Sequence, residues 1–331
     1  MGETSGGAPY GLSVADFRRM NAMHDHARPW AAAKRAFLTA LDRVAAPDAN
    51  TSVDFVESTG KGLSRRGFTA RLDIDPDPSD LSGQYVALFA LRDAVTGYPA
   101  RVRREMRVLE WLSPRIRRIR VPSVLALIDD EPAPILIVSH VPGLEVDLMH
   151  HGRTPIQPWN LVAEAASAIH AAPLPSADIL PPRDRKQHRA DVFHELFDAL
   201  ADPPAVIADA AAWMREHIER PGRGALLHGD LLGPNLRFHP DRRLGVIDWE
   251  YAEIGDPARD LAIVTRGVRQ PFKIPHGAAR LLAAYEAHGG HEVEDDDLRF
   301  FELALHVHLC RGTVSQALGS HAVIARLLRE A

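Results

Sequence analysis

The chain has 331 residues, a net charge of −5, 46% hydrophobic residues and one cysteine. This composition indicates a globular protein of about two domains; it excludes an intramolecular disulfide and offers no basic surplus for nucleic acid. No apolar run approaches the roughly 18 residues needed to cross a bilayer, and the N-terminus lacks a signal-peptide pattern. We therefore expect a cytoplasmic protein with no membrane or nucleic-acid partner.

The first part of the chain is predicted to be a sheet interrupted by one helix. Helices are expected over 14–24 and 29–45, where good helix formers combine with apolar residues spaced three and four apart. Alternating and apolar runs then predict five strands, over 51–58, 67–74, 84–92, 121–129 and 134–141. The interrupting helix is expected over 101–112.

The second part is predicted to be a helical body that carries a small β-hairpin. The last strand of the first part is broken by Pro142 and Gly143, so the joint falls at 139–143. The hairpin has strands at 236–238 and 244–247 around the polar turn His239–Arg243. Helices are expected over 159–170, 189–201, 204–220, 260–268, 276–288 and 295–319.

Three polar side chains flank the predicted hairpin. Asp230 follows His228 and Gly229, Asn235 comes five residues later, and Asp248 directly follows the second strand. Because a hairpin returns the chain on itself, Asn235 and Asp248 should sit at the same open end. Oxygen donors gathered beside another carboxylate suit a hard divalent cation and a general base.

These motifs carry a family resemblance. His-Gly-Asp, the later Asn, "IDWE" at 247–250 and "GDPARDLA" at 255–262 resemble the aminoglycoside phosphotransferase and choline kinase group, which are small-molecule kinases. The resemblance implies an α+β, protein-kinase-like fold of two lobes, with an N-terminal antiparallel sheet and one helix, and a mostly helical C-terminal lobe. The expected parts are an N-terminal extension (1–45), a nucleotide-binding lobe (46–141) and a catalytic and acceptor-binding lobe (142–331).

The resemblance also implies roles for the clustered residues. Asp230 would orient and deprotonate a substrate hydroxyl, while Asn235 and Asp248 would bind Mg²⁺. His228 and Asp260 would support the catalytic loop. The alternative is that Asp230 and Asn235 merely cap turns, which does not explain the second aspartate where the hairpin returns.

The nucleotide, ATP or GTP, is expected in the sheet-rich part. The turn around Gly62 and Ser64 resembles the family's phosphate-approaching turn, although the spacing of a Walker motif is absent. The plainer alternative is a hairpin turn with solvated Lys61, Arg65 and Arg66. The segment before Pro142 resembles the interlobe linker, where backbone groups would contact the base at Ser139, His140 and Val141.

One position departs from the kinase pattern. Kinases carry a strand lysine that contacts the α- and β-phosphates and pairs with a glutamate on the following helix, but 84–93 contain no lysine. Some branches of the family carry arginine there, so the role is assigned to Arg92 with Glu105 as its partner. Lys61 is the rival cation.

The acceptor is expected among the helices of 150–225 and those beyond Thr265. A cationic aminoglycoside would need converging acidic residues, for which Glu286, Asp295–Asp297 (Asp297 above all) and Glu302 are candidates. The adjoining apolar stretch 300–309 equally suits a neutral or amphipathic acceptor. The predicted function is transfer of a γ-phosphate to a hydroxyl of an antibiotic, such as an aminoglycoside or macrolide, or of a metabolite.

Other classes of protein fit less well. A catalytically silent module that binds nucleotide or a partner is the main alternative, favoured only by the missing lysine. A protein kinase would need an Ala-Pro-Glu element, which does not follow 255–262. The histidine pairs at 24–26, 150–151 and 306–308 lack zinc-site spacings, so no zinc site is expected.

Overall fold

The protein is described from a computed structural model. It describes residues 27–61, 65–77, 79–90, 97–129, 133–149, 156–198, 200, 202–241, 243–265, 272, 274–311 and 314–330, and only the backbone of 27–30, 55–61 and 314–318. The helix expected over 14–24 lies outside these residues. The chain forms two compact units, one up to Glu110 with Pro122–His140, the other Trp111–Val121 with the chain from Val141 onward.

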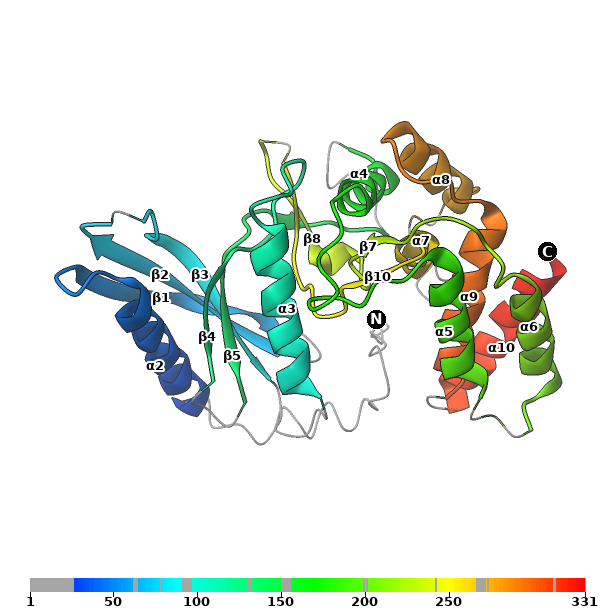
Figure 1. The fold of residues 1–331 in the computed structure, drawn as a ribbon, viewed down its shortest axis with the longest axis horizontal. Helices are drawn as coiled ribbons and strands as arrows, with labels where there is room; N and C mark the ends of the chain where they lie inside the picture. Colours follow the sequence, from blue (N-terminus) through cyan, green and yellow to red (C-terminus); the bar gives the residue numbers. More distant parts are fainter. Residues whose placement is uncertain are drawn as a thin grey trace, which may run out of the picture. The chain divides into compact units, whose positions relative to one another are not determined.

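The first unit is built on a five-stranded antiparallel sheet (Figure 1). Its strands are β1 (Asn50–Lys61), β2 (Arg65–Asp75), β3 (Gly83–Ala90), β4 (Val124–Ile128) and β5 (Ile135–Ser139). Their order across the sheet is β1-β2-β3-β5-β4, and every neighbouring pair is antiparallel. All five predicted strands are therefore confirmed.

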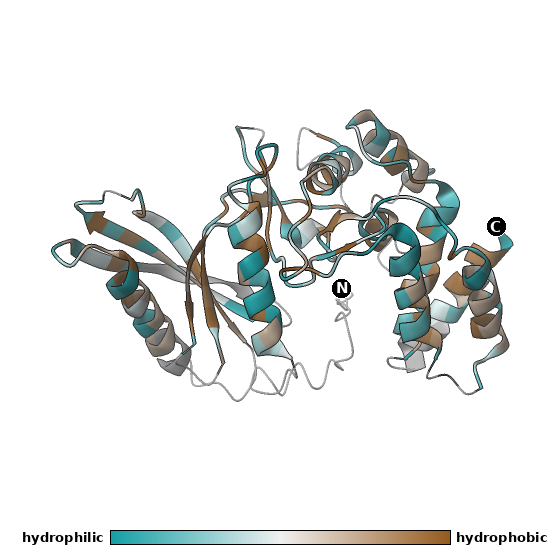
Figure 2. Cartoon of the chain, viewed as in Figure 1, coloured by the Kyte–Doolittle hydropathy of each residue, from teal (hydrophilic) through white to brown (hydrophobic). Residues whose placement is uncertain are grey.

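Helix α2 (Ala27–Val44) covers one face of this sheet (Figure 1). Its Phe37 and Leu41 are buried against Leu72 of β2 and Ile137 of β5 in a single hydrophobic core. Burying each such side chain contributes roughly 1.5–3 kcal/mol. Figure 2 shows β4 and β5 as mostly hydrophobic. The helix predicted over 29–45 is thus part of the core of the sheet-containing unit.

The second unit is mainly helical. Helix α3 (Tyr98–Leu112) belongs to the first unit up to Glu110, and its last two residues are assigned to the second. The second unit's own helices are α4 (Pro158–His170), α5 (Arg185–Phe197), α6 (Ala205–Glu216), α7 (Ala258–Thr265), α8 (Gly277–Ala287), α9 (Asp295–Leu309) and α10 (Val314–Arg329). Helices α5, α6 and α10 pack around α9, and α4 packs on α8 (Figure 1). None of the helices in the described part of the chain is long and apolar enough to cross a membrane.

Short strands of the second unit frame the catalytic segment. The predicted hairpin is confirmed as β8 (Leu236–Phe238) and β9 (Leu244–Val246), with Leu236 opposite Val246. Its turn is held by Asp241, whose carboxylate accepts a hydrogen bond from the Arg243 N–H at 2.9 Å. Three strands were not predicted, because runs of two or three residues show no periodicity: β6 (Leu144–Glu145), β7 (Ala225–Leu227) and β10 (Glu253–Gly255).

Two helix predictions need correction. The single helix expected over 295–319 is wrong, since α9 ends at Leu309 and α10 runs on to Arg329. Gly312, a weak helix former, lies between them. Helix α5 begins four residues earlier than expected because Asp184 forms a capping box with Gln187.

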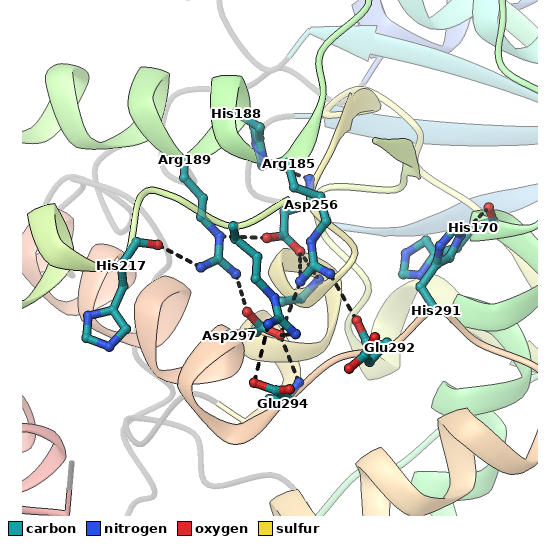
Figure 3. A network of polar contacts seen from close by, with 12 residues as sticks. His170, Arg185, His188, Arg189, His217, Asp256, His291, Glu292, Glu294 and Asp297 are labelled. Atoms are coloured by element: carbon teal, nitrogen blue, oxygen red, sulfur yellow. Dashed lines mark hydrogen bonds and ion pairs between the residues drawn. The ribbon is translucent and has the colours of Figure 1, made fainter. Parts of the chain in front are cut away.

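A buried network of charges joins three helical segments of the second unit (Figure 3). The Arg189 guanidinium of α5 donates to Asp256 Oδ2 at 2.7 Å and to Asp297 Oδ1 of α9 at 2.6 Å. Arg185 contacts the same two carboxylates at 3.1 and 3.2 Å, and Arg220 contacts Asp297 at 3.1 Å. Arg189, Asp256 and Asp297 are 2%, 0% and 3% exposed, so these contacts exclude water.

Because this network is buried, breaking it on one side should be costly. Asp297→Ala would leave Arg185 and Arg189 with Asp256 as the one carboxylate of this network, and would remove one of the two carboxylates that Arg220 contacts. We therefore expect the free energy of unfolding to fall by about 3–5 kcal/mol. Asp295→Ala is the matched control, since Asp295 is exposed and pairs with Arg299 one turn away; it should cost about 0.5 kcal/mol or less. Urea unfolding curves measure both, and equal losses would contradict the role given to the network.

Candidate active site

The predicted catalytic residue lies in a loop that is otherwise buried. Strand β7 pairs with β10, and the chain then passes through His228 and Gly229, both buried, to Asp230. Leu231 and Leu232 behind it are also buried, whereas Asp230 is half-buried. Helix α4 packs against β7. The loop therefore holds one accessible carboxylate on a tightly packed support.

Asn235 is bonded directly to this carboxylate. Its amide Nδ2 donates to the Asp230 backbone carbonyl at 2.8 Å and to Asp230 Oδ2 at 3.1 Å. Its backbone N–H donates to the Leu232 carbonyl at 2.9 Å, within a short 3-10 turn, η1 (Gly233–Asn235). Since the amide nitrogen faces Asp230, the amide oxygen of Asn235 remains the group that can act as a metal ligand.

The hairpin brings Asp248 to the same place. The Ile247 N–H donates to the Asn235 backbone carbonyl at 3.0 Å, so Asp248 directly follows a residue bonded to Asn235. Asp248 has a φ of 68°, a left-handed conformation that costs a non-glycine residue energy and that clusters at functional sites. The buried Trp249 anchors this bend by donating from Nε1 to the Val246 carbonyl at 3.1 Å.

His228 ties the catalytic loop to the hairpin. Its Nε2 lies 2.9 Å from the Ile247 carbonyl, which can only accept, so Nε2 carries the proton and Nδ1 accepts from the Asp230 N–H at 3.3 Å. The ring also packs edge-on against Trp249. Burial lowers the pKa of His228, outweighing the opposite effects of Asp260 and Asp230. His228 is therefore a neutral positioning residue.

Asp260 of α7 holds the backbone of the loop. Its carboxylate accepts hydrogen bonds from the N–H groups of His228 and Gly229, both at 2.8 Å. Burial by itself would raise the pKa of Asp260, but the hydrogen bond from His170 and the loop contacts lower it overall. The carboxylate is thus charged, and its charge strengthens the two hydrogen bonds that it accepts from the loop.

Gly229 is required by this geometry. Its φ is 81°, and a Cβ at this position would lie 2.3 Å from the Tyr251 carbonyl oxygen. Any side chain would force the loop away from its neighbour. The glycine of the His-Gly-Asp motif therefore permits the close packing that positions Asp230.

Sequence reasoning missed His170, the last residue of α4. Its Nε2 lies 3.2 Å from Asp260 Oδ2 and its Nδ1 lies 2.6 Å from the Tyr285 hydroxyl. Because the carboxylate accepts, Nε2 donates and Nδ1 accepts from Tyr285, which in turn accepts from the His291 N–H at 3.2 Å. A single histidine at the end of an apolar helix gave no signal of this contact.

In the first unit, Glu105 forms an ion pair with an arginine that the sequence analysis did not assign to it, which leaves the predicted pairing with Arg92 untested. The Glu105 carboxylate of α3 lies 2.5 Å from Nη1 of Arg65, the first residue of β2. Arg92, Gly62 and Ser64 lie outside the described residues, so their assignments stay predictions.

The linker residues are bonded into the sheet. Ser139 donates its N–H to the Ser123 carbonyl at 2.8 Å, and His140 donates its N–H to the Gln84 carbonyl at 2.8 Å. These two N–H groups are therefore engaged within the first unit. If the backbone of 139–141 contacts the base, we expect the contacts to be made by its carbonyls and by Val141.

The acidic candidates for acceptor binding differ in their surroundings. Glu286 on α8 and Asp295 and Asp296 at the start of α9 are exposed, and the two aspartates pair with Arg299. Asp297 is held by the buried arginines, so it serves the framework. Burial raises the pKa of Glu302 to about 7, which makes it a weak anion at neutral pH. Asp297 is thus the candidate that the structure assigns to another role, and the others stay predictions.

Within the described ranges, no three His, Cys, Asp or Glu side chains converge as metal ligands. The pair formed by Asn235 and Asp248 supplies one amide and one carboxylate oxygen, a set that suits Mg²⁺ rather than zinc. Mg²⁺ commonly takes its other ligands from phosphates and water, so two protein oxygens fit this ion.

This fold and this arrangement of Asp, Asn and Asp define a kinase-like phosphotransferase. Comparison with known proteins agrees. The model of the phosphotransferase enzyme family, APH, matches residues 80–301. The chain therefore belongs to this family, as the sequence resemblance predicted, and is a phosphotransferase with an alcohol group as acceptor.

Similarity to individual proteins of the family agrees with this assignment. Over 212 residues the chain is 28% identical to an aminoglycoside 3'-phosphotransferase of Streptomyces fradiae, covering 59% of this chain and 75% of that protein. Over 152 residues it is 32% identical to the viomycin phosphotransferase of Streptomyces vinaceus, covering 41% of this chain and 50% of that protein. The crystal structure of aminoglycoside phosphotransferase APH(4)-Ia matches with a TM-score of 0.62 at 18% identity, covering 90% of this chain and 98% of that one. The likeness confirms the α+β protein-kinase-like fold.

The neutral state of His228 predicts a pH dependence of stability. Its pKa in the folded protein lies below the ordinary value of 6.5, so below about pH 6.5 the unfolded chain takes up a proton that the folded chain excludes. Stability from this residue should be complete above that pH and fall as the pH is lowered, by at most about 1.4 kcal/mol per pH unit. Urea unfolding at pH 7.5, 6.5 and 5.5 should show a smaller loss for His228→Gln than for the parent. Parallel curves would contradict a buried neutral His228.

Proposed function

We propose that the chain transfers the γ-phosphoryl group of ATP or GTP to a hydroxyl of a polar, hydroxyl-rich antibiotic. Two observations support this acceptor class. The relatives named above are phosphotransferases of aminoglycosides and viomycin. Solved structures of the same fold include a macrolide 2'-phosphotransferase at 20% identity and complexes with kanamycin or hygromycin B.

Asp230 is the residue that would receive the acceptor hydroxyl. The observation that carries the proposal is its double connection to Asn235, which fixes both the backbone and the carboxylate of Asp230. An amide donor on one carboxylate oxygen fixes the orientation in which Asp230 would meet the substrate O–H. Positioning of this kind, rather than strong basicity, is what phosphoryl transfer requires of a base.

Asn235 and Asp248 would hold Mg²⁺ through the amide oxygen and the carboxylate. When bound, the ion would neutralise the charge that gathers on the phosphate oxygens during transfer. The left-handed bend at Asp248 and the bond between Ile247 and Asn235 keep the two oxygen donors in place before the ligand arrives. This preorganisation supports a catalytic rather than a silent module.

The co-substrate is proposed to be a nucleoside triphosphate. Solved relatives of this fold hold ADP, AMP-PNP or GDP. In this chain the backbone of 139–141 is proposed to contact the base through its carbonyls and through Val141, because the N–H groups of Ser139 and His140 are bonded within the first unit. A carbonyl accepts a hydrogen bond from the exocyclic amino group of either purine, so these contacts do not distinguish ATP from GTP. Assays with each nucleotide decide between them.

The function is tested by a panel of acceptors. Purified protein with Mg²⁺ and either ATP or GTP should add the mass of one phosphate to at least one aminoglycoside, tuberactinomycin (the class of viomycin) or macrolide. Mass spectrometry reads the product, and Asp230→Asn serves as the inactive control. Phosphorylation of sugars or choline with no antibiotic modified would overturn the acceptor class while leaving the reaction type intact.

Removing the Asp230 carboxylate should affect turnover more than binding. We expect Asp230→Asn to lower kcat by roughly 10²–10⁴, the range of positioned acid–base groups, with the nucleotide KM changed little. Steady-state kinetics with the best acceptor measure both constants. Asp241→Asn is the matched control, because Asp241 lies in the hairpin turn and is exposed. A kcat within a few-fold of the parent would show that Asp230 is not the base.

A further inference from the structure

We infer that Arg65, held in place by Glu105, is the cation that contacts the phosphates of the nucleotide. The inference rests on the proposed nucleotide-dependent function and goes beyond it by naming a positioning pair. It transfers to Arg65 of β2 the role that the sequence pattern assigned to Arg92.

Arg65 occupies the right place on the sheet. It is the first residue of β2, directly after residues 62–64 in the sequence, which lie outside the described residues and whose glycine and serine the sequence analysis compared with the family's phosphate-approaching segment. In the antiparallel register it lies opposite Ala90, the last residue of β3. Arg65 therefore stands beside the strand end from which the sequence pattern expected a cation to reach the phosphates.

Its side chain lies on the face of the sheet opposite α2. Successive residues of a strand point to opposite faces, and Ala70 and Leu72 of β2 belong to the core formed with α2. Arg65 and Thr69 consequently share the other face. The residues of β3 opposite them, Ala90 and Val86, are apolar, and 83–90 contain no basic residue. On this face of β2 and β3, Arg65 is therefore the cation at the end where β2 begins and β3 ends.

The ion pair with Glu105 gives the guanidinium a fixed orientation. Nη1 of Arg65 lies 2.5 Å from Oε2 of Glu105, and the two residues are 5% and 1% exposed. A buried ion pair adds little net stability over an apolar pair of similar size, so its presence favours a specific use. An arginine oriented by a carboxylate offers phosphate a planar set of donors.

A purely structural role would be to tie β2 to α3. The two roles predict different effects on ligand affinity. A phosphate-binding cation increases the affinity for a nucleotide but does not change the affinity for the nucleoside, which has no phosphate. A structural tie would affect both ligands alike or neither.

The experiment is calorimetric titration with the diphosphate that the parent binds, ADP or GDP, and with the corresponding nucleoside. The main variant is the double substitution Arg65→Met with Glu105→Gln, which removes both charges so that no buried carboxylate is left alone. We expect the affinity for the diphosphate to fall roughly 10- to 100-fold, because one charged hydrogen-bonding contact is lost. The affinity for the nucleoside should stay within about two-fold of that of the parent. Arg65→Lys should recover part of the loss.

Arg66→Met is the matched control. Arg66 has the same charge in the same strand but lies on the opposite face, over the Phe68 ring at 5.2 Å. Its diphosphate affinity should stay within about two-fold of the parent. Thermal melts verify that each variant is folded.

Each remaining outcome overturns the inference in a distinguishable way. Unchanged diphosphate affinity in the double variant, with a large loss in Arg92→Met or Lys61→Met, would return the role to one of those residues. Equal losses for diphosphate and nucleoside would show a structural tie. A parent chain that binds neither diphosphate would overturn the proposed function itself.

Discussion

The catalytic loop depends on one buried carboxylate. Asp260 accepts hydrogen bonds from two successive backbone N–H groups, those of His228 and Gly229, and from the His170 side chain. Such bonds are strong because one partner is charged and water is excluded. They position the backbone immediately before Asp230, so the placement of the proposed catalytic side chain depends on a residue thirty positions later in the chain.

The same short segment also joins the loop to the helical framework. Asp256 lies two residues before α7, and Asp260 lies in the first turn of this helix. Asp256 pairs with Arg185 and Arg189 of α5, whereas Asp260 faces the catalytic loop. The segment 255–262 therefore connects two buried polar networks, one that holds helices together and one that holds the active site. This explains why its two aspartates are both 0% exposed.

The ion pairs of the two units illustrate different uses of buried charge. In the second unit three arginines share two carboxylates among α5, α9 and the chain between them, a multivalent arrangement that fixes a framework (Figure 3). In the first unit Arg65, the first residue of β2, pairs with Glu105 of α3. The ion pairs of the second unit hold its framework together, whereas the ion pair of the first unit orients Arg65 where a phosphate is proposed to bind.

The sequence by itself determined most of the longer helices and strands and predicted the chemistry of the loop. Period-2 alternation and turn residues predicted the five strands and the hairpin, and the spacing of Asp230, Asn235 and Asp248 predicted a phosphotransferase site, because these patterns act over a few residues. Tertiary structure alone decided the partner of Glu105, the enclosure of Asp297 among arginines, and the chain from Tyr285 through His170 to Asp260. Those residues are 40 to 115 positions apart in sequence. No local periodicity encodes such contacts, since they arise only when helices and strands pack and each buried charge must find its partner.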